Sequence, residues 1–301
     1  MKGVTHVSGA GGRLEMETTP WLVGHPRVMR IMQSGAQIPY NGMDARKNRK
    51  EDCVSVQALQ LPFLAWLSRF RAWVDVAVVV TVLVATNLVA HFTTVWASIA
   101  TVPISAAILV VLMRRRGMRW SELGLSPRHW KRGTLYSLAA VGLVLTVVAI
   151  GIALPFTRQF FLSERYATIS GALVASMIII PLQTVIPEEL AFRGVLHGTL
   201  ERAWGARGVF AAGSLLFGLW HVASSLGLTS GNAGLAAVFG TGLWGQVAGV
   251  VGAVVATAAA GLVFTWLRLR SGSILAPIAL HWSLNGAGAL AAALVWQISL
   301  G

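Results

Sequence analysis

Charged side chains are scarce in this chain, and acidic ones are the scarcest. Asp, Glu, Lys and Arg make up 12% of the 301 residues, about half of the share that soluble globular proteins carry. After Glu164 the acidic residues are Glu188, Glu189 and Glu201 alone. Apolar residues make up 55% of the chain, and its mean hydropathy is +0.67. This composition excludes an ordinary soluble domain.

Cysteine is nearly absent as well. Cys53 is the one cysteine, which excludes an intramolecular disulfide and a metal site built from cysteines. The alternating pattern of a transmembrane barrel is also missing. Several apolar runs are instead long enough for helices that cross a bilayer, which takes about 20 residues. The sequence therefore predicts an all-α fold, a polytopic helical transmembrane bundle with a polar intramembrane cavity.

The N-terminal quarter differs from the rest of the chain. Residues 1–55 are polar and show no sustained hydrophobic period, so we expect a disordered basic tail. No apolar core follows the early charges, so we expect no signal peptide, and Met16 and Met43 are alternative in-frame starts. Residues 56–73 mix large apolar side chains with arginine, which is typical of an interfacial amphipathic helix. The transmembrane bundle is expected at residues 74–301.

The apolar runs predict about seven spans and a topology. They lie at about 74–94, 95–113, 134–154, 169–190, 208–226, 236–267 and 273–296. The loops after the second, fourth and sixth runs are rich in Lys and Arg, and such loops stay in the cytoplasm. We therefore expect a cytoplasmic N-terminus and an extracytoplasmic C-terminus in the plasma membrane. The net charge of +13 follows from this topology, so no nucleic-acid partner is expected.

Two adjacent carboxylates, Glu188 and Glu189, lie in an apolar run and are followed by Arg193. An ionisable group at membrane depth is costly, so it indicates a functional site. Neighbouring residues on a helix point about 100° apart, so the two glutamates cannot share one direction. Glu189 and Arg193 face the same way and can form an ion pair, which leaves Glu188 free to hold a water as a general base. The alternative is an ion pair at a helix end, with Glu188 solvated.

Two histidines lie in later apolar runs. His221 ends the segment that begins at Phe217, and His281 lies four residues before Asn285. Each alone is compatible with a packing residue or an interhelical hydrogen bond. At 1.5 Å of rise per residue from the cytoplasmic end, Glu188, His221 and His281 lie roughly 22, 20 and 15 Å deep. A carboxylate, two imidazoles and an amide at one depth can activate water and stabilise an oxyanion.

In order and spacing, these motifs resemble those of the CPBP family, which contains type II CAAX prenyl endopeptidases and bacteriocin-processing, Abi-like membrane proteins. The motifs are EExxxR at Glu188–Arg193, FxxxH at Phe217–His221 and HxxxN at His281–Asn285. The resemblance covers about residues 170–290. It implies a glutamate-dependent intramembrane endopeptidase with a cavity open to the cytoplasm. The implied substrate is a protein C-terminus or a precursor peptide.

The resemblance also implies a role for each motif residue. Glu188 would activate the attacking water, while Glu189 and Arg193 would support and orient it. Three residues would position the water or stabilise the oxyanion: His221, His281 and Asn285. The family is described both as metalloproteases and as metal-free proteases. A divalent metal such as zinc would be held by His221 and His281 with Glu188.

Other functions use the same residues differently. A non-proteolytic immunity or scaffold protein would bind a partner at the polar cluster. A proton-coupled transporter would use Glu188 and His221 as a relay, but no inverted repeat supports it. A rhomboid-like serine protease is disfavoured because Ser214 lacks the flanking pattern of that nucleophile. A prenylated substrate would require a host that prenylates proteins, which this sequence does not reveal.

Overall fold

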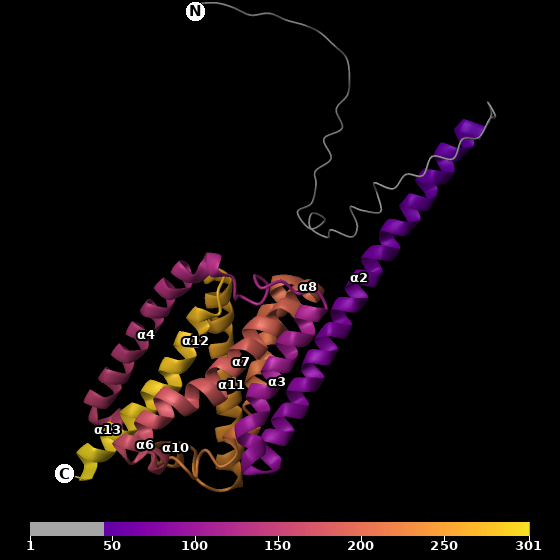
Figure 1. Cartoon of the computed structure of the whole chain (residues 1–301). Coiled ribbons are helices and arrows are strands. Elements are labelled where there is room, and N and C mark those ends of the chain that lie inside the picture. The colour runs from indigo at the N-terminus through magenta and orange to yellow at the C-terminus, as the bar shows by residue number, and fades with distance from the viewer. Residues whose placement is uncertain (1–44, 301) are drawn as a thin grey trace, which may run out of the picture. The chain divides into compact units, whose positions relative to one another are not determined.

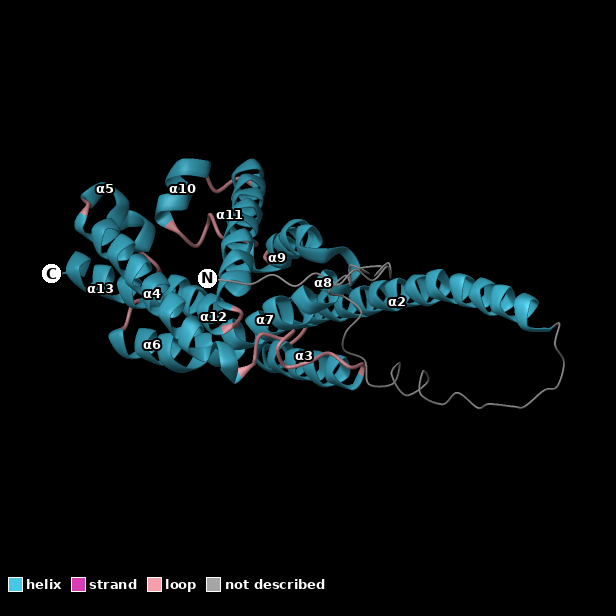
Figure 2. Ribbon diagram, turned by 90° about the horizontal axis from the view of Figure 1, so that it is seen from above, coloured by secondary structure: helices cyan, strands magenta, loops and turns pink. Residues whose placement is uncertain are grey.

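The computed structural model describes residues 45–300, and every regular element in that range is a helix (Figures 1 and 2). This confirms the predicted all-α polytopic fold. The chain divides into two compact units, residues 1–59 and 60–301, and the packing described below belongs to the second. Residues 1–44 and 301 lie outside the described range, so the predicted disorder of the tail is not tested there.

Helices of α, 3-10 and π type alternate along the chain. In order they are α2 (Ala45–Phe92), α3 (Val95–Arg115), η1 (Pro127–His129), α4 (Trp130–Ala153), α5 (Pro155–Arg158), η2 (Gln159–Phe161), η3 (Glu164–Tyr166), α6 (Ile169–Val174), η4 (Ala175–Val185), α7 (Ile186–Glu189), η5 (Leu190–Leu196), α8 (His197–Gly208), η6 (Val209–Gly213), α9 (Ser214–Trp220), η7 (Ala223–Ser225), α10 (Ala233–Phe239), α11 (Leu243–Ser271), α12 (Leu275–Trp282), η8 (Ser283–Ala287) and α13 (Gly288–Leu300).

Helix α2 is longer than the sequence predicted. Residues 45–55, which the sequence assigned to the tail, form its first turns, because no glycine or proline interrupts residues 45–61. The predicted interfacial segment, residues 56–73, belongs to the same helix without a boundary. Its location at a membrane surface stays a prediction.

Six helical runs of the described chain are long and apolar enough to cross a membrane, where the sequence predicted about seven. They are Trp66–Phe92, Val95–Arg115, Pro127–Ala153, Ile169–Trp220, Leu243–Ser271 and Leu275–Ser299. The difference lies in the fourth run, which contains two of the predicted spans.

A glycine turn explains this difference. Gly205 has φ 73° and ψ −171°, a conformation that glycine adopts at no steric cost, and it breaks the helix. A Cβ on Gly213 would lie 3.6 Å from Cδ1 of Leu200. The rings of Phe192 and Phe217 also meet, with centroids 5.2 Å apart. The chain therefore turns back at Gly205, and Ile169–Trp220 consists of two antiparallel arms.

The basic segments lie together at one end of the bundle. The loop between α3 and η1, residues 116–126, carries Glu122, whose Oε1 accepts a hydrogen bond from Arg202 Nε at 2.7 Å. Arg268, near the end of α11, donates through Nη2 to the Glu122 carbonyl oxygen at 2.9 Å. Burial alone would raise the pKa of Glu122, but hydrogen bonds from Arg202 and from the Arg119 backbone bring it below its ordinary value. This clustering is what the positive-inside rule requires of loops on one side.

Close packing joins the helices of this bundle. Lipid is as apolar as the buried side chains, so van der Waals contact rather than exclusion of water holds transmembrane helices together. Gly218 on α9 lies directly against α11, where a Cβ would meet the Val254 carbonyl oxygen at 2.7 Å and the Ala258 Cβ at 2.8 Å. The contact between α9 and α11 therefore depends on the missing side chain at this position.

We predict that Gly218→Ala lowers the thermal unfolding temperature of the purified protein in detergent. The added Cβ forces α9 away from α11, and overpacking of this kind costs about 1–3 kcal/mol. Gly252→Ala on α11 is the matched control, because a Cβ there meets no atom within 4 Å. Equal unfolding temperatures for the two variants would contradict the close contact.

Candidate active site

The two adjacent glutamates lie on a short α-helical turn between two π-helical segments. They occupy the end of α7, with η4 before it and η5 after it. Glu188 is 6% exposed and Glu189 is fully buried. Turns of π-helix inside longer helices are rare and occur frequently at functional sites. The two glutamates therefore lie on a short stretch of α-helix that has the rarer π-helical backbone on both sides.

Glu189 joins two segments that are distant in the sequence. Its Oε1 accepts a hydrogen bond from Arg193 Nη1 at 3.2 Å and another from His281 Nδ1 at 2.9 Å. The pair of Glu189 and Arg193 confirms the spacing argument from the sequence. The carboxylate and the guanidinium compensate each other's charge where water cannot. His281 comes from α12, so the buried Glu189 carboxylate links the motif at Glu188–Arg193 to the motif at His281–Asn285.

Aromatic rings hold the partners of Glu189 in place. The Arg193 Cζ lies 3.8 Å from the ring centroid of Phe217 and 4.6 Å from that of Phe264. The His281 ring stacks on Phe264, with centroids 5.4 Å apart and an interplanar angle of 27°. Guanidinium groups are attracted to ring faces, more strongly when water is excluded. Arg193 and His281 are thus clamped as well as hydrogen-bonded.

His221 lies on the same aromatic frame. Its ring centroid is 4.7 Å from that of Phe217, and the His281 centroid is 5.9 Å from the same ring. His221 Nδ1 lies 2.8 Å from the Phe217 carbonyl oxygen. A carbonyl oxygen only accepts, so Nδ1 carries the hydrogen, and a lone pair is left on Nε2 whenever the ring is in its neutral form. The structure therefore places both predicted histidines around one phenylalanine.

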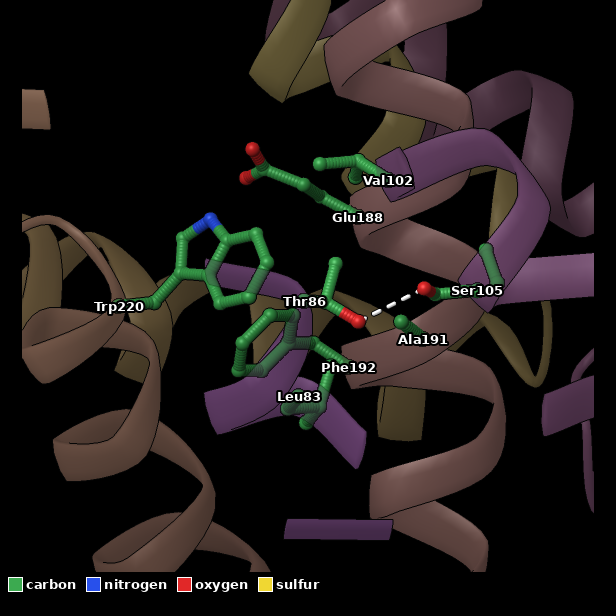
Figure 3. A pocket seen from close by; sticks show the side chains of 9 residues that line it. Leu83, Thr86, Val102, Ser105, Glu188, Ala191, Phe192 and Trp220 are labelled. Atoms are coloured by element: carbon green, nitrogen blue, oxygen red, sulfur yellow. Dashed lines mark hydrogen bonds between the residues drawn. The ribbon is translucent and has the colours of Figure 1, made fainter. Parts of the chain in front are cut away.

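Glu188 lines a small cavity of its own (Figure 3). The cavity measures about 10 Å³, close to the lower limit for one water molecule. The Glu188 side chain and the Trp220 indole extend toward each other across it, and the hydroxyls of Thr86 and Ser105 are hydrogen-bonded at 2.7 Å in its wall. In the described chain Glu188 Oε2 is buried without a hydrogen-bond partner. Glu189 is thus engaged by protein groups, whereas Glu188 faces the cavity.

A larger apolar cavity of about 410 Å³ adjoins the first and shares Leu83, Phe192 and Trp220 with it. Asn87 lines it too and donates through Nδ2 to the Trp220 carbonyl oxygen at 2.9 Å. The remaining lining residues are Val80, Val84, Leu88, Phe92, Leu216, Leu219, Val222, Ala223 and Leu226. The cavity therefore lies between the Phe92 end of α2 and the end of α9.

The sequence missed the side chains that α2 and α3 contribute to these cavities. Thr86, Asn87 and Ser105 belong to no motif that was recognised. The available signal was the adjacent polar pair Thr86–Asn87 within a mainly apolar run, since polar groups inside membrane segments mark functional positions. Packing alone could show that these residues meet Glu188 and Trp220.

Asn285 differs from the expectation. The sequence placed it on one helical face with His281, but His281 is 4% exposed whereas Asn285 is exposed. No side-chain hydrogen bond of Asn285 occurs within residues 45–300. Asn285 lies in the π-helical segment η8, whose i→i+5 bonding shifts residues four apart off a common face. The structure does not bring it to the carboxylates.

The proposed metal ligands do not fit one ion in this structure. Among the described residues, no three His, Cys, Asp or Glu side chains lie close enough together to hold a metal. His281 directs Nδ1 at Glu189 rather than at Glu188, and His221 directs Nδ1 at a backbone carbonyl. The term metalloprotease therefore has no support from these side chains, and no step below passes through a metal.

These features define a class: helical membrane proteins with a buried carboxylate–arginine–histidine cluster beside a carboxylate that faces a cavity. Residues 170–287 match the family model described as type II CAAX prenyl endopeptidase Rce1-like. Residues 170–287 therefore form a domain of this family of CAAX endopeptidases, which are peptide hydrolases, and this confirms the resemblance found in the sequence. No curated protein and no solved structure matches the chain.

We predict that Glu189→Gln destabilises the purified protein much more than Glu188→Gln does. Glu189→Gln removes the carboxylate charge that contacts the buried Arg193 at 3.2 Å, and breaking a buried pair in this way costs about 3–5 kcal/mol. Glu188 Oε2 loses no protein partner in its variant. Thermal unfolding in detergent measures both. Similar losses of unfolding temperature for the two variants would contradict the claim that Glu189, but not Glu188, is bound by buried protein groups.

Proposed function

We propose that this protein is a glutamate-dependent endopeptidase in which Glu188 activates the attacking water. One observation carries the proposal. Glu188 is a buried carboxylate whose Oε2 has no protein partner, and it lines a cavity close to the size of a single water. Its neighbour Glu189 binds Arg193 and His281 through Oε1, and although its Oε2 also lacks a hydrogen-bond partner, Glu189 lines neither of the two cavities.

The proposed reaction is a proton transfer coupled to addition. Glu188 takes a proton from the water as its oxygen bonds to the scissile carbonyl carbon, which gives a tetrahedral oxyanion. The carbon–nitrogen bond then breaks, and the proton held by Glu188 passes to the leaving amine. The products are a carboxylic acid and an amine, and the carboxylate is regenerated.

The remaining motif residues would support this step. Glu189 and Arg193 fix the helix that carries Glu188, and Glu189 holds the ring of His281. In the neutral form, His221 and His281 each keep a lone pair on Nε2, which can accept a hydrogen bond from the water and orient it. Nothing around Asn285 supports the role that the resemblance implies, so the proposed mechanism does not use it.

The substrate is proposed to be an apolar peptide or protein C-terminus. The larger cavity is apolar in its walls and adjoins the cavity of Glu188, so it would take an apolar group next to the scissile bond. Several of its lining side chains are also exposed on the bundle surface, among them Val84, Leu88 and Leu226. The cavity therefore opens sideways, toward where lipid would lie. A cytoplasmic opening stays a prediction.

The proposed orientation places the basic end of the bundle in the cytoplasm. Arg202, Arg268 and the loop of residues 116–126 meet there. Asp75, near the start of the first span, forms an ion pair with Arg116 at the same end. This supports a cytoplasmic N-terminal side for the first span and an extracytoplasmic C-terminus. The plasma membrane as the location belongs to the same proposal.

The proposal is tested with purified protein in nanodiscs and two fluorescence-quenched peptides. One peptide ends in a farnesylated Cys-aliphatic-aliphatic-X sequence, and the other is the same peptide without the farnesyl group. We expect the parent protein to cleave at least one of them, and Glu188→Gln to lower kcat by about 10²–10⁴-fold, the contribution typical of a general base. The preferred peptide defines the substrate class.

Glu201→Gln is the matched control, because the Glu201 side chain is 40% exposed and lies outside both cavities. Its kcat should stay within about two-fold of the parent. Equal rates for the parent and Glu188→Gln, or no cleavage of either peptide by the parent, would contradict the proposal. The second result would favour a partner-binding immunity or scaffold role for the same cluster.

A further inference from the structure

Arg268 is a buried arginine outside the three motifs. It is 5% exposed and lies near the end of α11. Its Nε donates to the carbonyl oxygen of Arg193 at 3.2 Å, and its Nη2 donates to the carbonyl oxygens of Ser121 at 3.2 Å and Glu122 at 2.9 Å. Burying a charge is costly unless it is paired or hydrogen-bonded. Here the guanidinium joins the 116–126 loop to the π-helical segment that carries Arg193.

The loop is built to receive this guanidinium. Gly124 has φ +72°, and a Cβ there would lie 2.5 Å from Arg268 Nε. The Gly124 carbonyl oxygen accepts a hydrogen bond from the Ile274 backbone N–H at 3.1 Å, just before α12 begins. Since α12 carries His281, the loop contacts Arg268 on one side and the start of the histidine helix on the other.

We propose that Arg268 is a positioning residue for peptide hydrolysis, which fixes the backbone of Arg193 and thereby the chain of contacts from Arg193 through Glu189 to His281. This inference rests on the proposed function. The connection has three links: Arg268 to the Arg193 carbonyl, Arg193 Nη1 to Glu189 at 3.2 Å, and Glu189 to His281 at 2.9 Å. Glu188 lies on the same helix, one residue before Glu189.

The geometry requires arginine rather than any cation. A guanidinium presents five donors in a rigid plane, so it can bind carbonyls of two segments at once. A lysine ammonium is a compact point charge on a flexible stem and would not hold both. Misplacement of catalytic groups by about 1 Å can cost 10²-fold in rate. Loss of the bridge should therefore reduce the rate of the chemical step while leaving substrate binding in the apolar cavity intact.

The test measures kcat and KM of Arg268→Gln and Arg268→Lys in nanodiscs with the peptide that the parent cleaves. For Arg268→Gln we expect kcat to fall about 10–100-fold, with KM within about two-fold of the parent. Arg268→Lys keeps the positive charge, and its kcat should lie between those of the parent and Arg268→Gln. If Arg268→Gln does not fold, the kcat of Arg268→Lys is the test of the positioning role. Thermal unfolding checks that each assayed variant is folded.

Arg202→Gln is the matched control for loosening the same loop. Arg202 binds Glu122 Oε1 at 2.7 Å and the Gly117 carbonyl oxygen at 3.1 Å, but it makes no hydrogen bond to Arg193. If Arg268 acts through Arg193, Arg202→Gln keeps kcat within about two-fold of the parent even where it lowers the unfolding temperature.

Two outcomes would overturn the positioning role. One is a folded Arg268 variant with parental kcat, and the other is an equal loss of kcat in Arg202→Gln. Both differ from failure of the proposed function, in which the parent and Glu188→Gln would show equal rates before any Arg268 variant is assayed.

Discussion

The structure of the site depends on one buried carboxylate. Glu189 accepts hydrogen bonds from Arg193, four residues later, and from His281, on a helix 92 residues away. In an environment without water, such a group is stable only while its charge and its lone pairs are matched by fixed partners. The aromatic rings of Phe217 and Phe264 close around those partners. The helices that carry the motifs are thereby held in one arrangement.

This constraint separates the roles of the two glutamates. Glu189 is engaged by Arg193 and His281 through Oε1, whereas Glu188 is the carboxylate that faces a cavity. The family segment, residues 170–287, supplies both acids, but α2 and α3 lie before it and supply Thr86, Asn87 and Ser105 to the cavity walls. Both glutamates thus come from the family segment, whereas the cavity walls combine residues of that segment with residues of α2 and α3.

Local spacing was predictable from the sequence, whereas contacts made by packing were not. The pair of Glu189 and Arg193 follows from four-residue spacing on one helix, and the all-helical fold follows from the apolar runs. Counting residues placed His281 near the depth of the glutamates. The count could not show that Glu189, rather than Glu188, accepts the hydrogen bond from the His281 ring. Asn285 was misplaced because the count assumed α-helical geometry where the chain forms a π-helix. The two cavities depend on side chains from separate helices, and no single run reveals them.

The central claim is that Glu189 couples the glutamate helix to the histidine helix. A double-mutant cycle of Glu189→Gln and His281→Gln, read as free energies of unfolding in detergent, measures that coupling directly. The structure predicts an interaction energy between about 0.5 and 3 kcal/mol, because each single variant already breaks the same contact. Effects that add within about 0.3–0.5 kcal/mol, as for distant sites, would contradict it.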